Sequence, residues 1–323
     1  MATSFTVGTF NVENLFTRYK FRGKRVKYVQ GGKTRYKYVE YTPAELSKVV
    51  KGGVRIETKM FSRIFGTHRG LTAAAIKAVK ADVLGLQEVE SLDTLKLFNS
   101  GNLKGKARYK YPFVIDGNDP RFIDVGVLSR LPIDFVRTHQ YTRKGRSYLF
   151  SRDCLEVHIR VGRKTVPIFV NHLKSMIGGR AQTKARRASQ CAGILAILKE
   201  RFGKNFGQSD FVVLGDMNDY MEPGRQSESG IRDLLKSDQM ENVVDRLPEA
   251  ERWTHFYSRS KEYRQLDYIL VSKSLAERNP SARPVIERRG MPRRAEKVKK
   301  FFKDVKGKQK ASDHCPVAIT LEV

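Results

Sequence analysis

The sequence predicts an α/β protein in which two β-sheets pack into a sandwich. Two patterns carry this prediction: helix-like and strand-like segments alternate in the first part of the chain, and hairpin-like pairs of strands dominate later. With 323 residues, of which 40% are hydrophobic, the chain can bury one sizeable core, so we expect a single domain spanning residues 1–323. No apolar run approaches the roughly 20 residues that a membrane-spanning helix needs.

The N-terminal part is predicted to contain a strand, a hairpin and a helix start. Phe5–Phe10 is a short apolar run typical of a buried strand. In KRVKYVQGGKTRYKYVEY, Tyr and Val alternate with Lys and Arg on either side of two glycines, which predicts a hairpin that turns at Gly31-Gly32. Thr42–Glu45 is typical of a helix start, because Thr is a good N-cap, Pro suits the first helical position and Glu can close a capping box.

Two later segments predict helices, and the remaining apolar runs predict strands. Leu71–Lys80 is rich in alanine and leads into the apolar run Val83–Leu86. Gln182–Arg201 carries apolar residues at helical spacing, among which Cys191 is expected to fill the core. The other predicted strands are Val125–Leu128, Leu155–Val161, Val166–Val170, Phe211–Leu214, Tyr268–Val271 and Val317–Leu321.

Polar residues stand repeatedly at the start or the end of these strands, in the segments TFNVEN, GLQEVE, FVNHLKS, VLGDMND, LDYILVS and SDHCPV. Because the end of one strand and the start of its antiparallel neighbour share an edge of a sheet, all six segments can deliver their polar groups to one rim. The residues concerned are Asn11, Glu88, His172, Asp216, Asn218, Asp267, Asp313 and His314. Carboxylates, amides and imidazoles in this combination suit a divalent cation and a phosphate ester.

In their order, spacing and residues, the six segments resemble the endonuclease/exonuclease/phosphatase superfamily, and within it the pancreatic-type deoxyribonucleases. The resemblance extends from about Phe5 to Leu321. It implies a four-layer α/β/β/α sandwich of two mixed, largely antiparallel sheets. NHLKS, around His172, resembles the deoxyribonuclease and sphingomyelinase branches. Many abasic-site endonucleases carry a lysine two places after the residue that Glu88 matches, and this chain has Glu90 there.

The resemblance also implies a metal site and a general base. Hard oxygen ligands favour Mg²⁺ or Mn²⁺ over zinc. The positions that match the family's metal site are Glu88, Asn11 with its neutral amide oxygen, and Asp313. His314 matches the general base, and Asp267 matches the carboxylate that holds its tautomer and stabilises the imidazolium.

Other residues are expected to act on the phosphate or the attacking water. Asp216 is expected to orient the water or to transfer a proton, and Asn218 to donate to a phosphoryl oxygen. His172 is expected to donate to the phosphate or to the leaving group. Arg152, in SRDCLEV, resembles a phosphate-contacting arginine beside its acid Asp153; the alternative for these two residues is an ion pair at the start of a strand.

The chain is strongly basic. Lys and Arg number 62 and Asp and Glu 34, a net charge of +28, which favours nucleic acid as the partner over an anionic membrane. Two insertions are especially basic, near residues 18–41 and 278–310, and both are expected to begin near the rim; loops that only aid solubility are the alternative. The residues expected to contact a phosphate backbone are Lys24, Arg25, Lys27, Lys33, Arg35, Lys37, Arg293, Arg294, Lys299 and Lys300.

Together these observations predict a divalent-metal-dependent nuclease, in particular a DNA endonuclease with little sequence specificity, because nothing in the chain reads as a recognition helix. The alternative is a phosphoesterase of the same fold acting on a lipid headgroup or a small phosphate ester, since NHLKS fits it equally well. A binding protein that has lost catalysis is disfavoured by the complete polar set. The absence of a visible signal peptide and the three widely spaced cysteines favour the cytoplasm, with secretion after removal of a leader left open.

Overall fold

The computed structural model describes residues 3–17, 19–21, 24–39, 42, 44–45, 61–63 and 68–323. The chain forms two compact units, Met1–Leu15 with Thr67–Val323, and Phe16–Gly66. The first basic insertion falls in the smaller unit and the second in the larger one. That the chain is one domain with two insertions stays a prediction.

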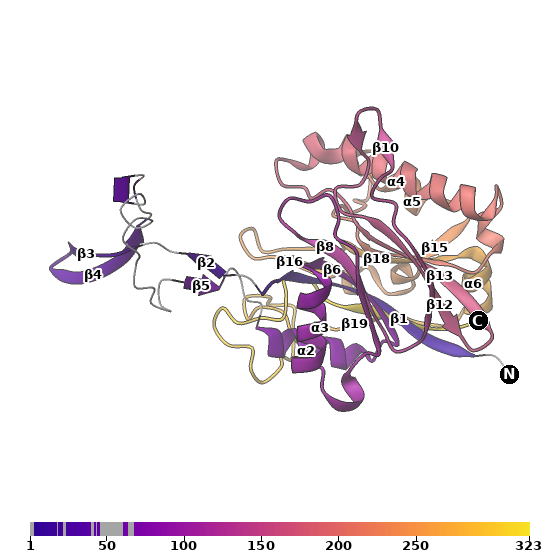
Figure 1. Ribbon diagram of the computed structural model, residues 1–323. Helices are drawn as coiled ribbons and strands as arrows, with labels where there is room; N and C mark the ends of the chain where they lie inside the picture. Colours follow the sequence, from indigo (N-terminus) through magenta and orange to yellow (C-terminus); the bar gives the residue numbers. More distant parts are fainter. Residues whose placement is uncertain are drawn as a thin grey trace. The chain divides into compact units, whose positions relative to one another are not determined.

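Two six-stranded sheets form the centre of the larger unit (Figure 1). The order of the first sheet is β19 (Val285–Ile286), β20 (Val317–Glu322), β1 (Ser4–Leu15), β6 (Val83–Val89), β8 (Asp124–Ser129) and β7 (Tyr111–Val114). The order of the second is β15 (Met240–Asn242), β18 (Asp267–Ser272), β14 (Val212–Asp216), β13 (Lys164–His172), β12 (Cys154–Val161) and β9 (Ile133–Arg137). Neighbouring strands are antiparallel except in the pairs β1–β6 and β13–β14.

Helices cover the outer faces of both sheets, so most central strands are apolar on both faces. On the first sheet lie α2 (Arg69–Val79) and α3 (Leu92–Asn102), and on the second α4 (Arg180–Phe202) and α5 (Arg232–Leu235), as Figure 1 shows. One apolar cluster fills the space between the sheets, a second lies under α2 and α3, and a third under α4. The predicted four-layer sandwich is therefore confirmed.

Shorter elements complete this unit. Helix α6 (Lys273–Arg278) follows β18, and two small hairpins pair β10 (Arg143–Lys144) with β11 (Ser147–Tyr148) and β16 (His255–Tyr257) with β17 (Glu262–Arg264). The 3₁₀ turns are Gly105–Ala107, Phe206–Gln208, Gln226–Glu228, Val243–Arg246 and Glu249–Glu251. Each predicted strand lies within or overlaps an observed one, and the helix predicted from Gln182 begins two residues earlier, at Arg180. Helix α3, which begins after its N-cap Ser91, was not predicted from the sequence.

The smaller unit contains the predicted basic hairpin. Strands β3 (Lys24–Gln30) and β4 (Lys33–Val39) pair antiparallel, and a second pair joins β2 (Tyr19–Phe21) to β5 (Phe61–Arg63). Gly31 and Gly32 have φ values of +58° and +71°, the left-handed geometry that a two-residue type I′ turn requires. The exposed basic side chains of the hairpin include Lys27, Lys33, Arg35 and Lys37; those of Lys24 and Arg25 lie outside the described side chains.

The predicted capping box is present in the same unit. The Glu45 N–H donates to Thr42 Oγ1 (3.3 Å), and the Thr42 N–H donates to Glu45 Oε2 (2.9 Å). This reciprocal pair satisfies two backbone donors at a helix start. Pro43, predicted at the first helical position, lies outside the described residues.

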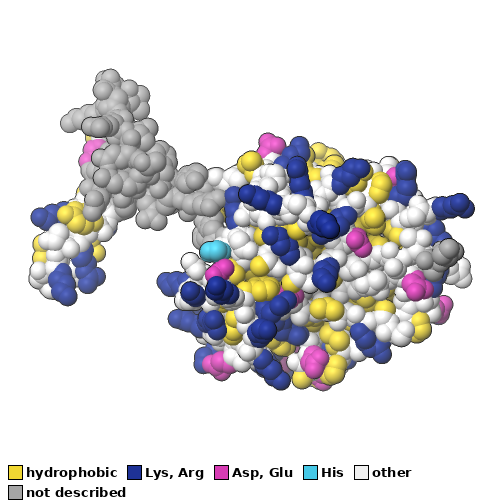
Figure 2. Space-filling view, turned by 90° about the horizontal axis from the view of Figure 1, so that it is seen from below, with side chains coloured by type: hydrophobic (Ala, Val, Ile, Leu, Met, Phe, Trp, Pro, Cys, Tyr) yellow, Lys and Arg dark blue, Asp and Glu magenta, His cyan; other side chains and the backbone are white. Residues whose placement is uncertain are grey.

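The second basic segment, 278–310, is part of the larger unit and, apart from β19, consists mainly of turns and irregular chain. Its buried apolar residues include Met291, Ala295, Val298 and Val305. Arg293 donates from Nε to the carbonyl of Val305 (2.9 Å) and lies over the ring of Phe301, so it stabilises the segment itself. Arg294, Lys299 and Lys300 are exposed. Figure 2 shows that Lys and Arg side chains outnumber acidic ones on the face it presents. Within the described part of the chain, no helix is long and apolar enough to cross a bilayer.

Candidate functional site

The structure brings the eight predicted rim residues to one end of the two sheets. Asn11 and Glu88 lie on the paired strands β1 and β6 of the first sheet. In the second sheet His172 pairs with Asp216 across β13 and β14, and Asp216 pairs with Asp267 across β14 and β18. Asn218 follows β14, and Asp313 and His314 precede β20. These strand ends therefore share one edge, as the positions of the polar residues predicted.

Two irregularities in the first sheet aim Glu88 into this cluster. The pairing register shifts between Asn11 and Leu15 in β1 and again between Gln87 and Val89 at the β6–β8 pairing. Glu13, Asn14 and Glu88 itself adopt left-handed backbone conformations, with φ values of +49°, +62° and +66°. Such conformations cost free energy in non-glycine residues and gather at functional sites. The Asn14 N–H donates to Glu88 Oε2 (3.0 Å), so the bulge positions the carboxylate directly.

Asn11 links two carboxylates of the cluster. Its Nδ2 donates to Asp216 Oδ2 (3.0 Å) and to Glu88 Oε1 (3.3 Å). Its Oδ1, the oxygen expected to bind a metal ion, accepts the backbone N–H of Glu13 (3.0 Å), and its role as a metal ligand stays a prediction. The geometry therefore favours Asn11 as the residue that aligns Glu88 with Asp216.

His314 has the surroundings of a general base. Its Nδ1 lies 2.8 Å from Asp267 Oδ2, and the same carboxylate oxygen accepts a hydrogen bond from Thr254 Oγ1 (2.7 Å). Its Nε2 lies 3.8 Å from Asp216 Oδ2. Burial disfavours the charged imidazole, but Asp267 and Asp216 outweigh burial and raise the pKa of His314 well above its ordinary value. The carboxylate on Nδ1 leaves Nε2 as the nitrogen that can take a proton.

His172 stands on the other side of Asp216 and differs from His314. Its Nε2 lies 3.5 Å from Asp216 Oδ2 and 4.0 Å from Glu88 Oε1. Burial, reinforced by the positive charge of Arg152, lowers the pKa of His172 well below its ordinary value. A neutral imidazole still carries one N–H, so His172 can donate a hydrogen bond to an anionic oxygen.

Three acidic groups of the cluster, Glu13, Glu88 and Asp216, have raised pKa values. Burial, with Asp313 as the next contribution, raises the pKa of Glu13 to about 7. The same two causes raise the pKa of Glu88, and burial raises that of Asp216 to about 7. Lys310, 2.6 Å from Glu13 Oε1, is the nearby cation on one flank. Carboxylate oxygens crowded in this way fit a hard divalent cation, which would relieve their repulsion.

Glu13 was not identified from the sequence, although it lies two residues after Asn11 in TFNVEN. Its Oε2 accepts the backbone N–H of Asp313 (3.0 Å), which ties β1 to the segment that carries His314. For Asp313, burial raises the pKa, but the charges of His314 and Lys310 outweigh it and the net pKa is lower than usual. Among the described residues, Asp216, Asp267 and His314 form a group whose possible ligand atoms lie within 4.8 Å of one another. The expected metal site at Asn11, Glu88 and Asp313 stays a prediction, with Glu13 as a further carboxylate beside Asp313.

Arg152 is buried beside the cluster, but its acidic partner is not Asp153. Its Nε lies 3.1 Å from Asp119 Oδ2, and Arg121 pairs with the same carboxylate (2.8 Å). Asp153 instead accepts hydrogen bonds from Thr138 Oγ1 and from the backbone N–H of residue 139. The expected alternative, a pair between Arg152 and Asp153 just before β12, is therefore wrong, because each side chain has another partner. No motif in the sequence indicated Asp119.

Asn218 is held in the loop that follows β14. Its Nδ2 donates to Asp216 Oδ2 (2.9 Å) and to the carbonyl of Leu173 (3.2 Å), and its backbone is left-handed, with φ at +52°. Asn is one of the few residues that adopt this conformation readily. The expected contact of Asn218 with a phosphoryl oxygen stays a prediction.

A buried ion cluster supports the loop after Asp216. Asp219 accepts hydrogen bonds from Arg187 Nε and Arg180 Nε, both at 2.8 Å, and from the backbone N–H groups of residues 220 and 230. Both Asp219 and Arg187 are fully buried. Arg187 also donates to the carbonyl of Lys174 (3.3 Å), so this cluster connects the loop after β14 with the loop after β13.

We expect Asp219→Asn to destabilise the protein by about 3–5 kcal/mol, because it leaves buried guanidinium charge uncompensated. Urea unfolding followed by circular dichroism measures the loss. Asp233→Asn is the matched control, since Asp233 is exposed and pairs with Arg232 in solvent, where an ion pair contributes about 0–1 kcal/mol. Equal midpoints for the two variants would show that the buried cluster carries no special stability.

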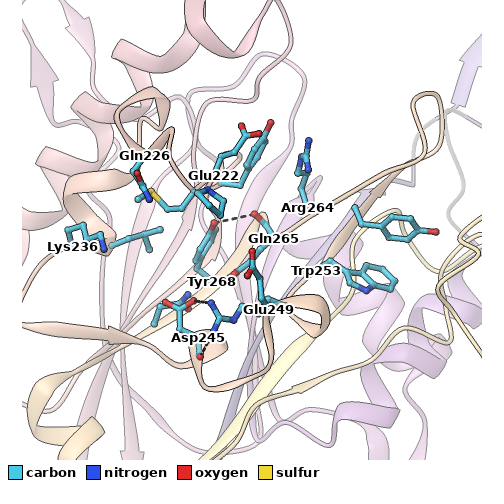
Figure 3. A pocket seen from close by; sticks show the side chains of 16 residues that line it. Glu222, Gln226, Lys236, Asp245, Glu249, Trp253, Arg264, Gln265 and Tyr268 are labelled. Carbon is cyan, nitrogen blue, oxygen red and sulfur yellow. Dashed lines mark hydrogen bonds and ion pairs between the residues drawn. The ribbon is translucent and has the colours of Figure 1, made fainter.

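The cavity drawn in Figure 3 is distinct from this cluster. It has a volume of about 450 Å³ and is lined by 16 residues, among them Tyr220, Trp253, Arg264, Gln265 and Tyr268. None of the predicted site residues lines it. Tyr268 alternates with Asp267 along β18, and its hydroxyl donates to the carbonyls of Asp219 and Gln265 (both 3.2 Å), so the cavity lies on the opposite face of that strand.

Comparison with known proteins relates the whole arrangement to other structures. The fold is similar to truncated Caenorhabditis elegans TDP2 (TM-score 0.57, 13% identity, 99% of this chain and 98% of that chain). It is also similar to D. rerio TDP2 complexed with a single-strand DNA product (0.57, 11%, 99% and 99%). A third similar structure is an endonuclease/exonuclease/phosphatase family protein from Bacteroides thetaiotaomicron (0.56, 15%, 100% and 98%). At these identities the likeness shows a shared fold.

Sequence comparison with curated proteins finds no match. A family model does match, over residues 67–314, which is more than half of the chain and includes seven of the eight predicted rim residues. The six segments that resemble this family in the sequence contain the strand ends described above. They also contain the His314–Asp267 pair and the buried acidic residues of the cluster. The chain belongs to the endonuclease/exonuclease/phosphatase family.

Proposed function

We propose that the protein is a divalent-metal-dependent nuclease that cleaves phosphodiester bonds within DNA, with little preference for sequence. The observation that carries the proposal is the pair of His314 and Asp267, with Nε2 of the histidine 3.8 Å from the carboxylate of Asp216. A general base next to a cation site is the combination that hydrolysis of a phosphodiester by water needs.

Each residue of the cluster has a role in this mechanism. His314 Nε2 accepts a proton from the attacking water, while Asp267 holds Nδ1 and stabilises the imidazolium. Asp216 orients the water, and neutral His172 donates to a phosphoryl oxygen or to the leaving oxygen. Mg²⁺ or Mn²⁺, held by Glu88 with Glu13 and Asp313 as further carboxylates, would supply charge relief at the phosphate. Asn218 and Arg152 are the further candidates for contact with phosphate.

DNA is the proposed substrate because of the charge and because of one related fold. The net charge of +28 creates long-range attraction for a polyanion. One of the structures of similar fold is a TDP2 in complex with a single-strand DNA product, so a protein of this architecture accommodates DNA. Contacts to the phosphate backbone alone carry no sequence information, which supports weak sequence preference.

Cleavage of supercoiled plasmid tests the proposal. Wild-type protein is assayed with Mg²⁺, with Mn²⁺ and with EDTA, at low and high salt, beside Glu88→Ala. Nicking that needs metal and Glu88 and that fades with salt supports a DNA endonuclease. If no DNA is cleaved but vesicles containing phospholipid or a small phosphodiester are hydrolysed, the protein is instead a phosphoesterase of the same fold, which NHLKS around His172 also fits.

We expect neutralisation of one face of the basic hairpin to weaken DNA binding more than turnover. Lys33, Arg35 and Lys37 alternate along β4 and are exposed, so they share a face of the strand. Changing all three to Gln should make the plot of the logarithm of the DNA association constant against the logarithm of salt concentration less steep, by up to about 2.7 in slope. This is about 0.9 for each phosphate that the variant no longer neutralises. Fluorescence anisotropy with labelled DNA at several salt concentrations measures this slope.

The control for the hairpin variant carries the same change of charge elsewhere. Lys77, Lys80 and Lys96, which are exposed on or next to α2 and α3, are changed to Gln together. A role for the hairpin in binding requires a larger loss of affinity in the hairpin variant than in this control, with the rate at saturating DNA preserved. An unchanged affinity with a large fall in the saturated rate would contradict the assignment.

A further inference from the structure

We propose that His255, Asp313 and His314 form a second metal site, for a borderline transition-metal ion such as Zn²⁺, and that its occupation inhibits the enzyme by blocking His314. One possible ligand atom from each residue lies within 4.8 Å of the others. His255 has no place in the mechanism described above, and nothing in its sequence context indicated a metal ligand.

The backbone holds the three residues together. His255 lies in β16 and forms an isolated antiparallel bridge with His314. The Phe256 N–H donates to the carbonyl of Asp313 (3.0 Å), and the Cys315 N–H donates to the carbonyl of Thr254. The two imidazole rings lie 4.6 Å apart between centroids, inclined at 59°. The side chains are therefore juxtaposed by paired chain segments and not by chance contact of mobile loops.

The distances suit one ion after side-chain rotations. A Zn–N or Zn–O bond is about 2.1 Å long, so two ligands of a tetrahedral zinc ion lie about 3.4 Å apart. Separations of up to 4.8 Å therefore need to shorten by up to about 1.4 Å. Among the described residues, the His255 ring nitrogens have no hydrogen-bond partner that would have to be displaced.

The chemistry of the ligands distinguishes this site from the one proposed for Mg²⁺, although both include the carboxylate of Asp313. Imidazole suits Zn²⁺, Co²⁺, Ni²⁺ and Cu²⁺, whereas Mg²⁺ prefers oxygen. Glu88 and Glu13 offer oxygen alone, but His255 and His314 offer two nitrogens beside the carboxylate of Asp313. Lys310 opposes the site, since its Nζ lies 3.7 Å from Asp313 Oδ2, but its shorter contact is with Glu13 (2.6 Å).

Inhibition follows from which nitrogen is free. Asp267 holds Nδ1 of His314, so a metal ion must bind Nε2, and a lone pair bound to a metal cannot accept a proton from water. This second step rests on the proposed function, whereas metal binding itself does not.

Binding is tested with Co²⁺, whose visible absorption reports nitrogen and oxygen ligands, added to metal-stripped protein in the presence of excess Mg²⁺. His255→Phe keeps a ring against His314 and removes both nitrogens; His68→Phe is the matched control, because His68 is exposed and outside the cluster. We expect the wild type and His68→Phe to bind one Co²⁺ that Zn²⁺ displaces, and His255→Phe to bind at least tenfold more weakly. Equal Co²⁺ affinity in all three proteins overturns the site. His255→Asn replaces His255→Phe if the latter does not fold.

Inhibition is tested by Zn²⁺ titration of plasmid nicking at constant Mg²⁺, with each protein compared with its own rate without Zn²⁺. The inhibitory concentration should rise at least tenfold in His255→Phe and stay unchanged in His68→Phe. An equal rise or no rise in both variants overturns the inhibitory role. If no protein cleaves any substrate, the proposed function fails, while the Co²⁺ titration still decides whether the metal site exists.

Discussion

Replacement of His314 by Ala should lower the saturated rate of phosphodiester cleavage by about 100- to 10,000-fold, the range that a positioned general base contributes. The structure gives the reason: Nε2 faces Asp216 at 3.8 Å, and Nδ1 is held by Asp267 at 2.8 Å. Without the imidazole, the rings of His172 and His255 remain nearby, but neither is hydrogen-bonded to Asp267 as His314 is. Rates of plasmid nicking at saturating DNA and Mg²⁺, with folding checked by circular dichroism, measure the loss.

The control for this variant is His68→Ala, which removes an exposed imidazole outside the cluster and should retain the full rate. Near-full activity of His314→Ala would falsify the assignment of the base. The same outcome would also contradict the proposed role of Asp267, because its carboxylate acts only by holding His314.

The pH dependence of the rate gives a second measurement of the same pair. A general base acts when it is neutral, so the rate should be low below the pKa of His314 and rise above it. Because Asp267 and Asp216 outweigh burial and raise that pKa, the rise should lie above the ordinary histidine value of about 6.5. Asp267→Asn removes the leading stabilising charge, so the rise should move to lower pH while the maximal rate falls. An unmoved profile would contradict the coupling.

The second large effect is expected at Glu88. Glu88→Gln preserves the shape of the side chain and removes the charge that would hold the cation. Charge relief by a metal lowers the activation free energy by several kcal/mol, and about 1.36 kcal/mol corresponds to a tenfold change in rate. We therefore expect a loss of about 100-fold or more in rate and a much higher Mg²⁺ requirement. Glu90→Gln is the control, since Glu90 lies two residues further along and accepts a hydrogen bond from Thr94.

Thermal unfolding gives a readout of the Glu88 site that does not depend on activity. A ligand that binds only the folded state raises the melting temperature. Mg²⁺ should therefore raise the melting temperature of the wild type and of Glu90→Gln, but not that of Glu88→Gln. Without metal, Glu88→Gln should melt no lower than the wild type, because burial and Asp313 raise the pKa of the native carboxylate and disfavour its charge. Equal Mg²⁺ stabilisation of all three proteins would place the cation elsewhere.

Local patterns were sufficient for the elements and for most of the rim. Apolar runs such as Val212–Leu214 can satisfy their side chains only in a buried strand, and polar residues directly after such a run must emerge at its end. The Gly31-Gly32 turn and the Thr42–Glu45 capping box were predictable for the same reason, because their conformations depend on neighbours within a few residues. Family resemblance then supplied roles that spacing alone does not reveal.

Partners that depend on distant parts of the chain were not predictable. Glu13 was missed because the bulge in β1, and not simple alternation, decides where its side chain lies. Asp119 replaced Asp153 as the partner of Arg152, although it is 33 positions away, because a loop between strands brings it there. His255 is brought to the site by the small hairpin of β16 and β17. Asp219 is held near it by Arg187 of α4.

By itself, then, the sequence determined the two-sheet sandwich, the identity of the rim residues and the positive charge, because each follows from local periodicity or from composition. The tertiary structure alone decided which carboxylate pairs with Arg152 and which nitrogen of His314 is free. It also decided which groups the amide nitrogen and the amide oxygen of Asn11 contact. These are matters of a few ångströms between segments far apart in the chain, and they are set by packing of the whole sandwich, which no local pattern records.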